Sequence, residues 1–75
     1  MSKHLQERIR RLRQAAGLSV SEAARRAKIH RVAWAELEAG KNDNPTLRTL
    51  EKIAQALEVS VAELLGDADG ESVTL

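Results

Sequence analysis

The 75-residue chain contains no cysteine, tyrosine or phenylalanine, and only one proline and one tryptophan. Without cysteine it can form neither disulfide bonds nor thiolate metal sites, which agrees with a reducing compartment. Because aromatic residues make up 1% of the chain, the core has to be built from Leu, Ile, Val and Ala. The sequence has no run of the roughly 18 apolar residues that cross a bilayer, and no signal-peptide segment. We expect one small cytoplasmic domain without a membrane partner.

The sequence also lacks the residue spacings of a catalytic or metal site. His4 and His30 lie far apart and have no Cys partners, which argues against zinc. The segment 67–71, DADGE, begins like a calcium loop but lacks the Glu at the twelfth position. The chain has no Gly-rich phosphate loop and no pairing of a nucleophile with a base. We therefore expect no metal, no cofactor and no enzymatic activity.

Charge is distributed unevenly, although the formal net charge is only +1. Residues 1–41 carry ten Lys or Arg against four Asp or Glu, whereas residues 42–75 carry two against seven. A chain polarised in this way can present a basic face to phosphate groups. The alternative explanation is a chance grouping of ordinary solvated helix faces.

Hydrophobic periodicity and capping signals predict five helices and no strand. Gly17 and Gly66 stand where the first and last helices end, and Pro45 lies in a turn-rich loop that cannot continue a helix. We expect an all-α fold, a compact five-helix bundle over residues 1–66, followed by an acidic tail over residues 67–75. The predicted helices, with their caps, cover residues 5–16, 19–27, 31–39, 46–57 and 60–65.

The segment 19–40 contains two of these helices, joined by a tight turn. Ser19 and Glu22 have the Ser-x-x-Glu spacing of a capping box, and three alanines after them allow a close helix crossing. Residues 28–30 form the turn, and Gly40 ends the second helix. This is the outline of a helix-turn-helix, whose second helix enters the DNA major groove.

The outward face of the helix at residues 31–39 has a chemically interpretable composition. Arg31 can donate two hydrogen bonds to guanine, Val32 and Ala35 can pack on thymine methyl groups, and Glu36 can accept from cytosine. Ordinary surface charge is the alternative for Arg31 and Glu36. Trp34 faces inward, and a lone aromatic residue there fits a core position better than a stacking platform, which uses several.

Polar and basic residues beside this face are candidates for phosphate contacts, which set affinity and register without reading bases. For each arginine, a solvated surface role is the alternative. The predicted phosphate contacts are Arg10, Ser19, Arg25, Arg26, Lys28, His30, Lys41 and Asn42.

With helices, turn and loop placed, the chain resembles the lambda-repressor/Cro-like helix-turn-helix family, also called the XRE family. The resemblance spans residues 5–66. Its specific pieces are IRRLRQAAGLS, WAELEAGKNDNPTLRTLEKIAQAL and VSVAELL, in this order. By this resemblance, Arg13 and Glu38 form an ion pair that ties the first helix to the recognition helix.

The chain departs from the family pattern at three positions. Val20 stands where the second helix commonly begins with Gln, and His30 where a Ser or Thr cap is frequent. Asp43 lies in a loop that is often basic. Each departure removes a candidate phosphate contact and leaves the fold intact.

The resemblance implies a sequence-specific regulator of transcription that binds double-stranded DNA as a homodimer, in a bacterium, phage or plasmid. Val61, Leu64 and Leu65 are the predicted dimer interface, because a short apolar helix near the chain end has little else to cover. Closing the monomer core is the alternative for these residues. A second functional interpretation is a protein-interaction or antitoxin-like module of the same fold, with a protein partner and weak or no DNA binding.

Overall fold

The computed structural model describes residues 3–42 and 44–66 of the chain. This part contains five helices and no strand, which confirms the predicted all-α bundle. None of these helices is long and apolar enough to cross a membrane. Asp43 and the predicted acidic tail lie outside the described residues. The helices are α1 (Lys3–Ala15), α2 (Val20–Ala27), α3 (Arg31–Ala39), α4 (Leu47–Leu57) and α5 (Val61–Leu65).

The helix ends follow the local signals of the sequence. Ser19 and Glu22 form both hydrogen bonds of a capping box at the start of α2, and Thr46 Oγ1 accepts from the backbone N–H of Thr49 at the start of α4. Gly40 ends α3 in a left-handed conformation, with φ at 82°. These positions match the predicted boundaries because capping depends on only a few consecutive residues.

The start of α5 and the end of α1 differ in detail from the simplest local pattern. Of the two bonds in a capping box, the structure shows one at the start of α5, from the backbone N–H of Glu63 to Ser60 Oγ at 2.9 Å. The first helix was expected to include Ala16, whereas α1 ends one residue earlier. The N–H of Ala16 still bonds to the Leu12 carbonyl at 3.0 Å, so the difference lies in how the last turn is delimited.

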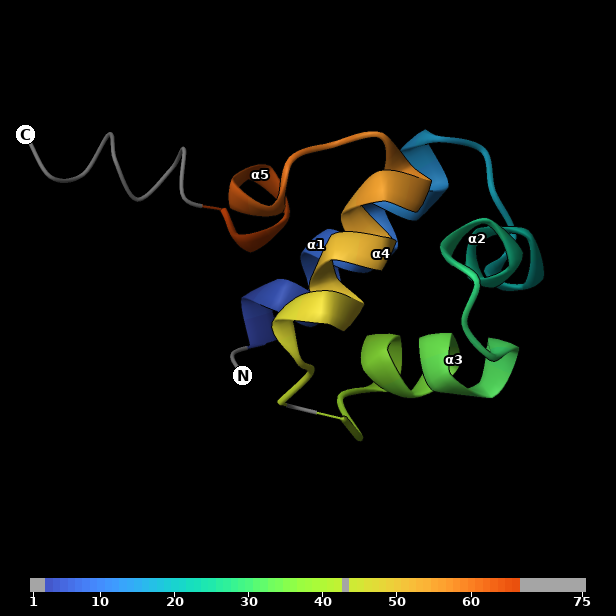
Figure 1. Ribbon diagram of the computed structural model, residues 1–75, viewed down its shortest axis with the longest axis horizontal. Coiled ribbons are helices and arrows are strands. Elements are labelled where there is room, and N and C mark those ends of the chain that lie inside the picture. Colours follow the sequence, from blue (N-terminus) through green and yellow to red (C-terminus); the bar gives the residue numbers. More distant parts are fainter. Residues whose placement is uncertain (1–2, 43, 67–75) are drawn as a thin grey trace, which may run out of the picture.

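All five helices contribute buried side chains to one core. Its largest fully buried side chains are Trp34, Ile9, Ile53 and Leu64, one from each of four helices. α2 contributes three buried alanines, which let it pack closely against α3 and α4. Figure 1 shows α3 at the lower edge of the molecule and α5 at the opposite end from α2. One side of α3 therefore remains uncovered.

Burial corrects the prediction for the fifth helix. Leu64 has none of its surface exposed, so it belongs to the monomer core and the expectation that it forms a dimer contact was wrong. Val61 is half-buried and packs against the same core. Leu65 remains 40% exposed. The physical reason is that α5 packs against both α1 and α4 and buries its apolar side there.

Candidate nucleic-acid interface

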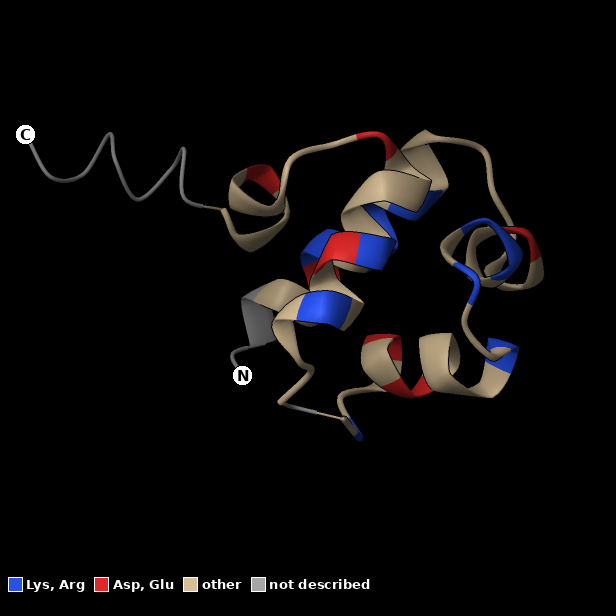
Figure 2. Ribbon diagram, viewed as in Figure 1, with Lys and Arg blue, Asp and Glu red and all other residues tan. Residues whose placement is uncertain are grey.

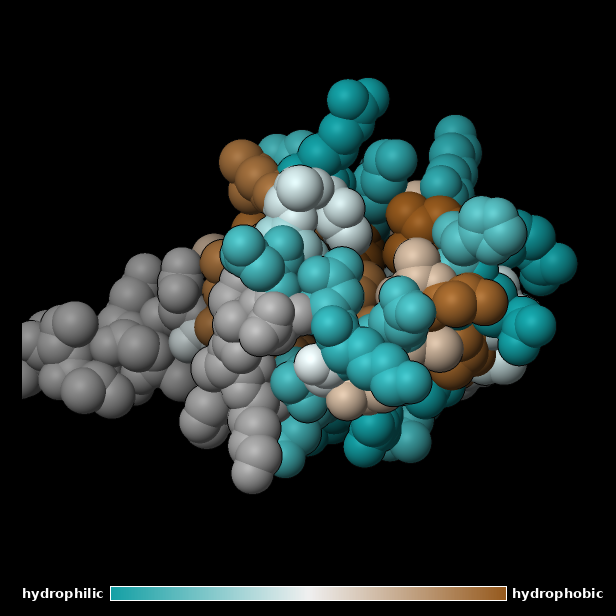
Figure 3. Space-filling model, turned by 90° about the horizontal axis from the view of Figure 1, so that it is seen from below, coloured by the Kyte–Doolittle hydropathy of each residue, from teal (hydrophilic) through white to brown (hydrophobic). Residues whose placement is uncertain are grey.

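α3 presents an inward and an outward face of different composition. Trp34 and Leu37 are buried against the other helices. The four residues predicted as base contacts are all exposed, and together with Ala39 and Lys41 they line one shallow hollow of about 260 Å³. Figure 3 views the molecule from the side on which α3 lies and shows a largely hydrophilic surface with small hydrophobic groups within it. The four residues are Arg31, Val32, Ala35 and Glu36.

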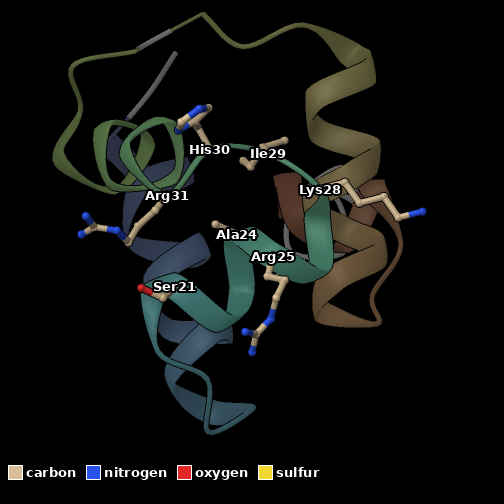
Figure 4. Close-up of a pocket in the computed structure, with 7 residues that line it drawn as sticks. All are labelled: Ser21, Ala24, Arg25, Lys28, Ile29, His30 and Arg31. Carbon is tan, nitrogen blue, oxygen red and sulfur yellow. The ribbon is translucent and has the colours of Figure 1, made fainter.

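A second hollow, of about 540 Å³, lies where α2 turns into α3. Figure 4 shows its lining residues, with the buried Ala24 among them and the charged side chains reaching outward. None of the residues that line it is acidic. Its positive charge is suited to an anion such as a phosphate group. The residues that line this basic hollow are Ser21, Ala24, Arg25, Lys28, Ile29, His30 and Arg31.

The turn between α2 and α3 has an unusual backbone and an incomplete cap. Lys28 ends α2 in the left-handed conformation, with φ at 60° and ψ at 40°, and its N–H bonds to the Arg25 carbonyl. His30 occupies the N-cap position of α3 but makes no side-chain cap hydrogen bond. The first N–H groups of α3 therefore have no side-chain partner at the cap. His30 and Arg31, at this end of α3, both line the basic hollow.

The other predicted phosphate contacts have different surroundings. Ser19 is exposed, but its Oγ already accepts from Glu22. Arg26 and Lys41 are exposed. Asn42 is exposed too, and its Oδ1 accepts from the backbone N–H of Asn44 at 3.3 Å. Figure 2 shows Lys and Arg on α2 and at the start of α3, and acidic residues at the end of α4 and on α5.

Arg13 and Glu38 lie in direct contact, as the resemblance implied. Arg13 Nε donates to Glu38 Oε2 at 2.6 Å and Arg13 Nη2 to Glu38 Oε1 at 3.1 Å. A third donor of the same guanidinium, Nη1, bonds to the Leu18 carbonyl at 2.9 Å. The pair therefore joins α1, the residue that precedes the cap of α2, and the last turn of α3.

Two further residues bind the same carboxylate, and the sequence interpretation had not placed them there. The Trp34 indole Nε1 donates to Glu38 Oε2 at 2.6 Å. Arg10 Nη2 donates to the Glu38 backbone carbonyl at 3.1 Å, and Arg10 Nε lies 3.6 Å from Glu38 Oε1. The four-residue spacing of Trp34 and Glu38 is the signal that could have revealed the first of these contacts.

Glu38 is the one buried charged residue in the described part of the chain, with 7% of its surface exposed. Burial acts to raise the pKa of its carboxyl group, but the hydrogen bonds from Arg13 and Trp34 outweigh it, and the pKa lies below the usual value. The same hydrogen bond raises the pKa of Arg13. Both groups therefore stay ionised at neutral pH.

Comparison with known proteins gives this geometry a context. A family model described as a helix-turn-helix domain matches residues 4–65. Among solved structures, the crystal structure of the master regulator for biofilm formation SinR in complex with DNA is similar, with a TM-score of 0.78 and 34% sequence identity. That match covers 81% of this chain and 97% of the other.

Two curated relatives are HTH-type transcriptional regulators named SinR. The protein from Bacillus licheniformis is 35% identical over 63 residues, which are 84% of this chain and 57% of that protein. The protein from Bacillus subtilis (strain 168) is 34% identical over 61 residues, which are 81% of this chain and 55% of that protein. The chain thus spans little more than half the length of these relatives. It belongs to the helix-turn-helix domain family, within the XRE-like group that its motifs indicated.

Proposed function

We propose that this protein is a sequence-specific DNA-binding regulator of transcription that inserts α3 into the major groove. The observation that carries the proposal is the exposed outward face of α3. It lies beside the basic hollow, whose lining includes basic side chains and no acidic residue. The similarity to a helix-turn-helix regulator solved in complex with DNA supports it. The Bacillus relatives support a bacterial, cytoplasmic setting.

The outward face of α3 would supply the base contacts. Arg31 would donate two hydrogen bonds to guanine O6 and N7, a pairing that discriminates between bases by about 1–3 kcal/mol. Val32 and Ala35 would pack on thymine methyl groups, and Glu36 would accept from cytosine N4. All four side chains are exposed in the free protein, as these roles require.

The basic hollow would hold the DNA backbone. Arg25, Lys28 and His30 would contact phosphates there. Further phosphate contacts would come from outside the hollow, from Arg26, Lys41, Ser19 and Asn42. If four phosphates are neutralised per protomer, the logarithm of the binding constant falls with the logarithm of the salt concentration at a slope of about −3.6.

A homodimer is part of the proposal. Two copies would place their α3 helices about 34–36 Å apart, one turn of DNA, on a two-fold symmetric site. The exposed Leu65 and the half-buried Val61 remain the candidates for the contact between copies.

Selection from a random library of duplex DNA at near-physiological salt tests this function. Sequencing of the bound pool is expected to reveal a two-fold symmetric motif with half-sites one turn apart. The variant Arg31→Ala is expected to lose preference at one base position of each half-site. A bound pool without any enriched motif would overturn the proposal.

A second candidate function is a protein-interaction module that has kept this fold and binds DNA weakly. Val20 favours it, because this first residue of α2 packs against the core and offers no polar group to a phosphate. The two candidates differ in their response to Arg31→Ala, since the interaction module would retain its activity in that variant.

A further inference from the structure

We propose that Arg10 is a positioning residue that sets the orientation of α3 on bound DNA and thereby contributes to base discrimination. This inference rests on the proposed function. It replaces the sequence-based assignment of Arg10 to a phosphate contact. Three observations carry it: the atoms that its guanidinium contacts, its alignment with two neighbours on α1, and the surface on its exposed side.

The guanidinium of Arg10 binds the last turn of α3 at the main chain. Its Nη2 donates to the Glu38 carbonyl at 3.1 Å. The backbone N–H groups of Lys41 and Asn42, which could have bonded to that carbonyl, both donate to Glu36 instead. Arg10 thus supplies a hydrogen bond to a helix-terminal carbonyl, and its charge lies at the negative end of the α3 dipole.

Arg10 is the middle member of a row of three side chains on one face of α1. Gln6, Arg10 and Arg13 follow at spacings of four and three residues, so they lie on the same side of the helix. Gln6 lies so close to Gly40 that a Cβ atom there would come within 2.6 Å of Gln6 Nε2. Arg13 holds the Glu38 carboxylate. Residues on successive turns of α1 therefore contact the C-terminal end of α3.

The exposed side of Arg10 is less basic than the hollow between α2 and α3. About half of the side chain is exposed, and it borders a hollow of about 320 Å³ lined by Glu7, Arg10, Arg11 and Gln14. The Glu7 carboxylate offsets one of the two arginine charges in that hollow and so weakens its attraction for an anion. The basic hollow between α2 and α3, in contrast, has no acidic lining residue.

Contacts that fix the C-terminal end of α3 also determine where its N-terminal end lies, and Arg31 is at that end. The nine-residue helix is about 13 Å long, so a small tilt at Glu38 displaces the Arg31 guanidinium from the geometry that a bidentate pair with guanine requires. Contacts with phosphates, made by long flexible side chains, tolerate the same tilt. Loss of Arg10 therefore reduces discrimination between sequences more than it reduces affinity for DNA in general.

The test compares Arg10→Gln with Arg11→Gln. Both remove one positive charge from α1, and Arg11 is exposed and makes no hydrogen bond or ion pair within the part of the chain that the structure describes. The probes are the duplex that the parent chain enriches from the random library and the same duplex with scrambled half-sites. Kd is measured for both probes over a series of salt concentrations, at a temperature at which circular dichroism shows each variant fully folded.

We expect Arg10→Gln to reduce the ratio of the two Kd values about tenfold and to leave the salt slope equal to that of Arg11→Gln. A phosphate contact would instead lower the slope by about 0.9 per site and leave the ratio unchanged; that result overturns the inference. A merely structural role would weaken binding to both probes equally, and this also overturns it.

Arg10→Lys provides a second variant that keeps the charge. An ammonium group cannot span the carbonyl and the carboxylate as the planar guanidinium does, so we expect the discrimination to fall here too. Unchanged discrimination in both Arg10 variants contradicts the inference alone. A parent chain that enriches no duplex contradicts the proposed function, and the inference falls with it.

Discussion

At the scale of single residues, two non-glycine residues adopt a left-handed backbone conformation, which costs them conformational free energy. Lys28 and Glu58 end α2 and α4 with φ at 60°, where an L side chain is strained by about 1–2 kcal/mol. Lys28 lies in the basic hollow, which gives its side chain a use in the proposed function. Glu58 is exposed at the far end of α4, away from α3.

Glu58→Gly is therefore expected to stabilise the protein by about 0.5–1 kcal/mol, because glycine adopts positive φ without strain. Thermal unfolding followed by circular dichroism measures the change as a rise of a few degrees in Tm. Glu51→Gly, within α4, serves as the control and should lower stability by about 1 kcal/mol. A Glu58→Gly protein that melts below the parent would contradict this account of the C-cap.

The lowered pKa of Glu38 predicts how the stability of the protein changes in acid. Its pKa is lower in the folded chain than in the unfolded chain, where it is about 4.3. Folding thus favours the ionised form: this stabilisation is complete above the unfolded pKa and is lost as the pH falls through the lower, folded value.

Glu38→Gln is expected to reduce stability at pH 7 by on the order of 3 kcal/mol, since Arg13 loses its ionised partner. The variant should also lose less stability than the parent on acidification below about pH 4. Urea unfolding at several pH values checks both effects, with the exposed Glu51→Gln as the charge-matched control. Parallel pH curves for parent and Glu38→Gln would refute the assignment.

At the scale of helices, α3 differs from α2, α4 and α5 in that its N-cap side chain makes no cap hydrogen bond. The side chains of Ser19, Thr46 and Ser60 each accept a backbone N–H hydrogen bond at the start of their helices, whereas the His30 side chain accepts none. His30→Ser is expected to stabilise the protein by about 0.5–1 kcal/mol by completing the cap. Differential scanning calorimetry measures this as a higher Tm, and Ser60→Ala provides the reverse change at α5. No rise in Tm for His30→Ser would show that α3 needs no cap.

The predictable part of this molecule is the part that neighbouring residues determine. Ser19, Glu22 and Gly40 mark helix ends through contacts a few positions away, so the boundaries of α2 and α3 could be predicted. The exposed and buried faces of α3 followed from helical spacing.

The surroundings of Leu64 and Arg10 depend on contacts between helices, which the sequence did not reveal. Leu64 is buried because α1 and α4 pack against α5. The apolar pattern of α5 does not show this packing, so Leu64 was assigned to a dimer interface. Arg10 resembled any other exposed basic residue because its partner, the Glu38 carbonyl, is 28 positions away. Sequence spacing shows which residues share a helix face but not which helix lies opposite.

At the scale of the whole molecule, the surface proposed to bind DNA and the surface proposed for contact between copies lie at separate places. The basic hollow and the outward face of α3 lie on one side, and α5 lies at the other end of the molecule (Figure 1). This separation allows two copies to meet through α5 while each keeps α3 free.

Leu65→Asp is expected to weaken self-association at least tenfold, because it places a charge in the proposed contact between copies. The variant should fold normally, since Leu65 is 40% exposed. Sedimentation velocity over a range of concentrations measures the effect. Leu47→Asp is the control, as Leu47 is an exposed apolar residue on α4, 63% exposed. Equal behaviour of the two variants would rule out α5 as the dimer contact.

The composition of the α3 surface also has a thermodynamic consequence. Of the residues that line its hollow, Val32, Ala35 and Ala39 have short side chains with almost no rotamer freedom to lose. The apolar part of this surface is ordered before any ligand arrives, so binding would release water from it at little cost in side-chain entropy. Calorimetry on a DNA complex should then show a negative change in heat capacity, the signature of apolar surface that becomes buried.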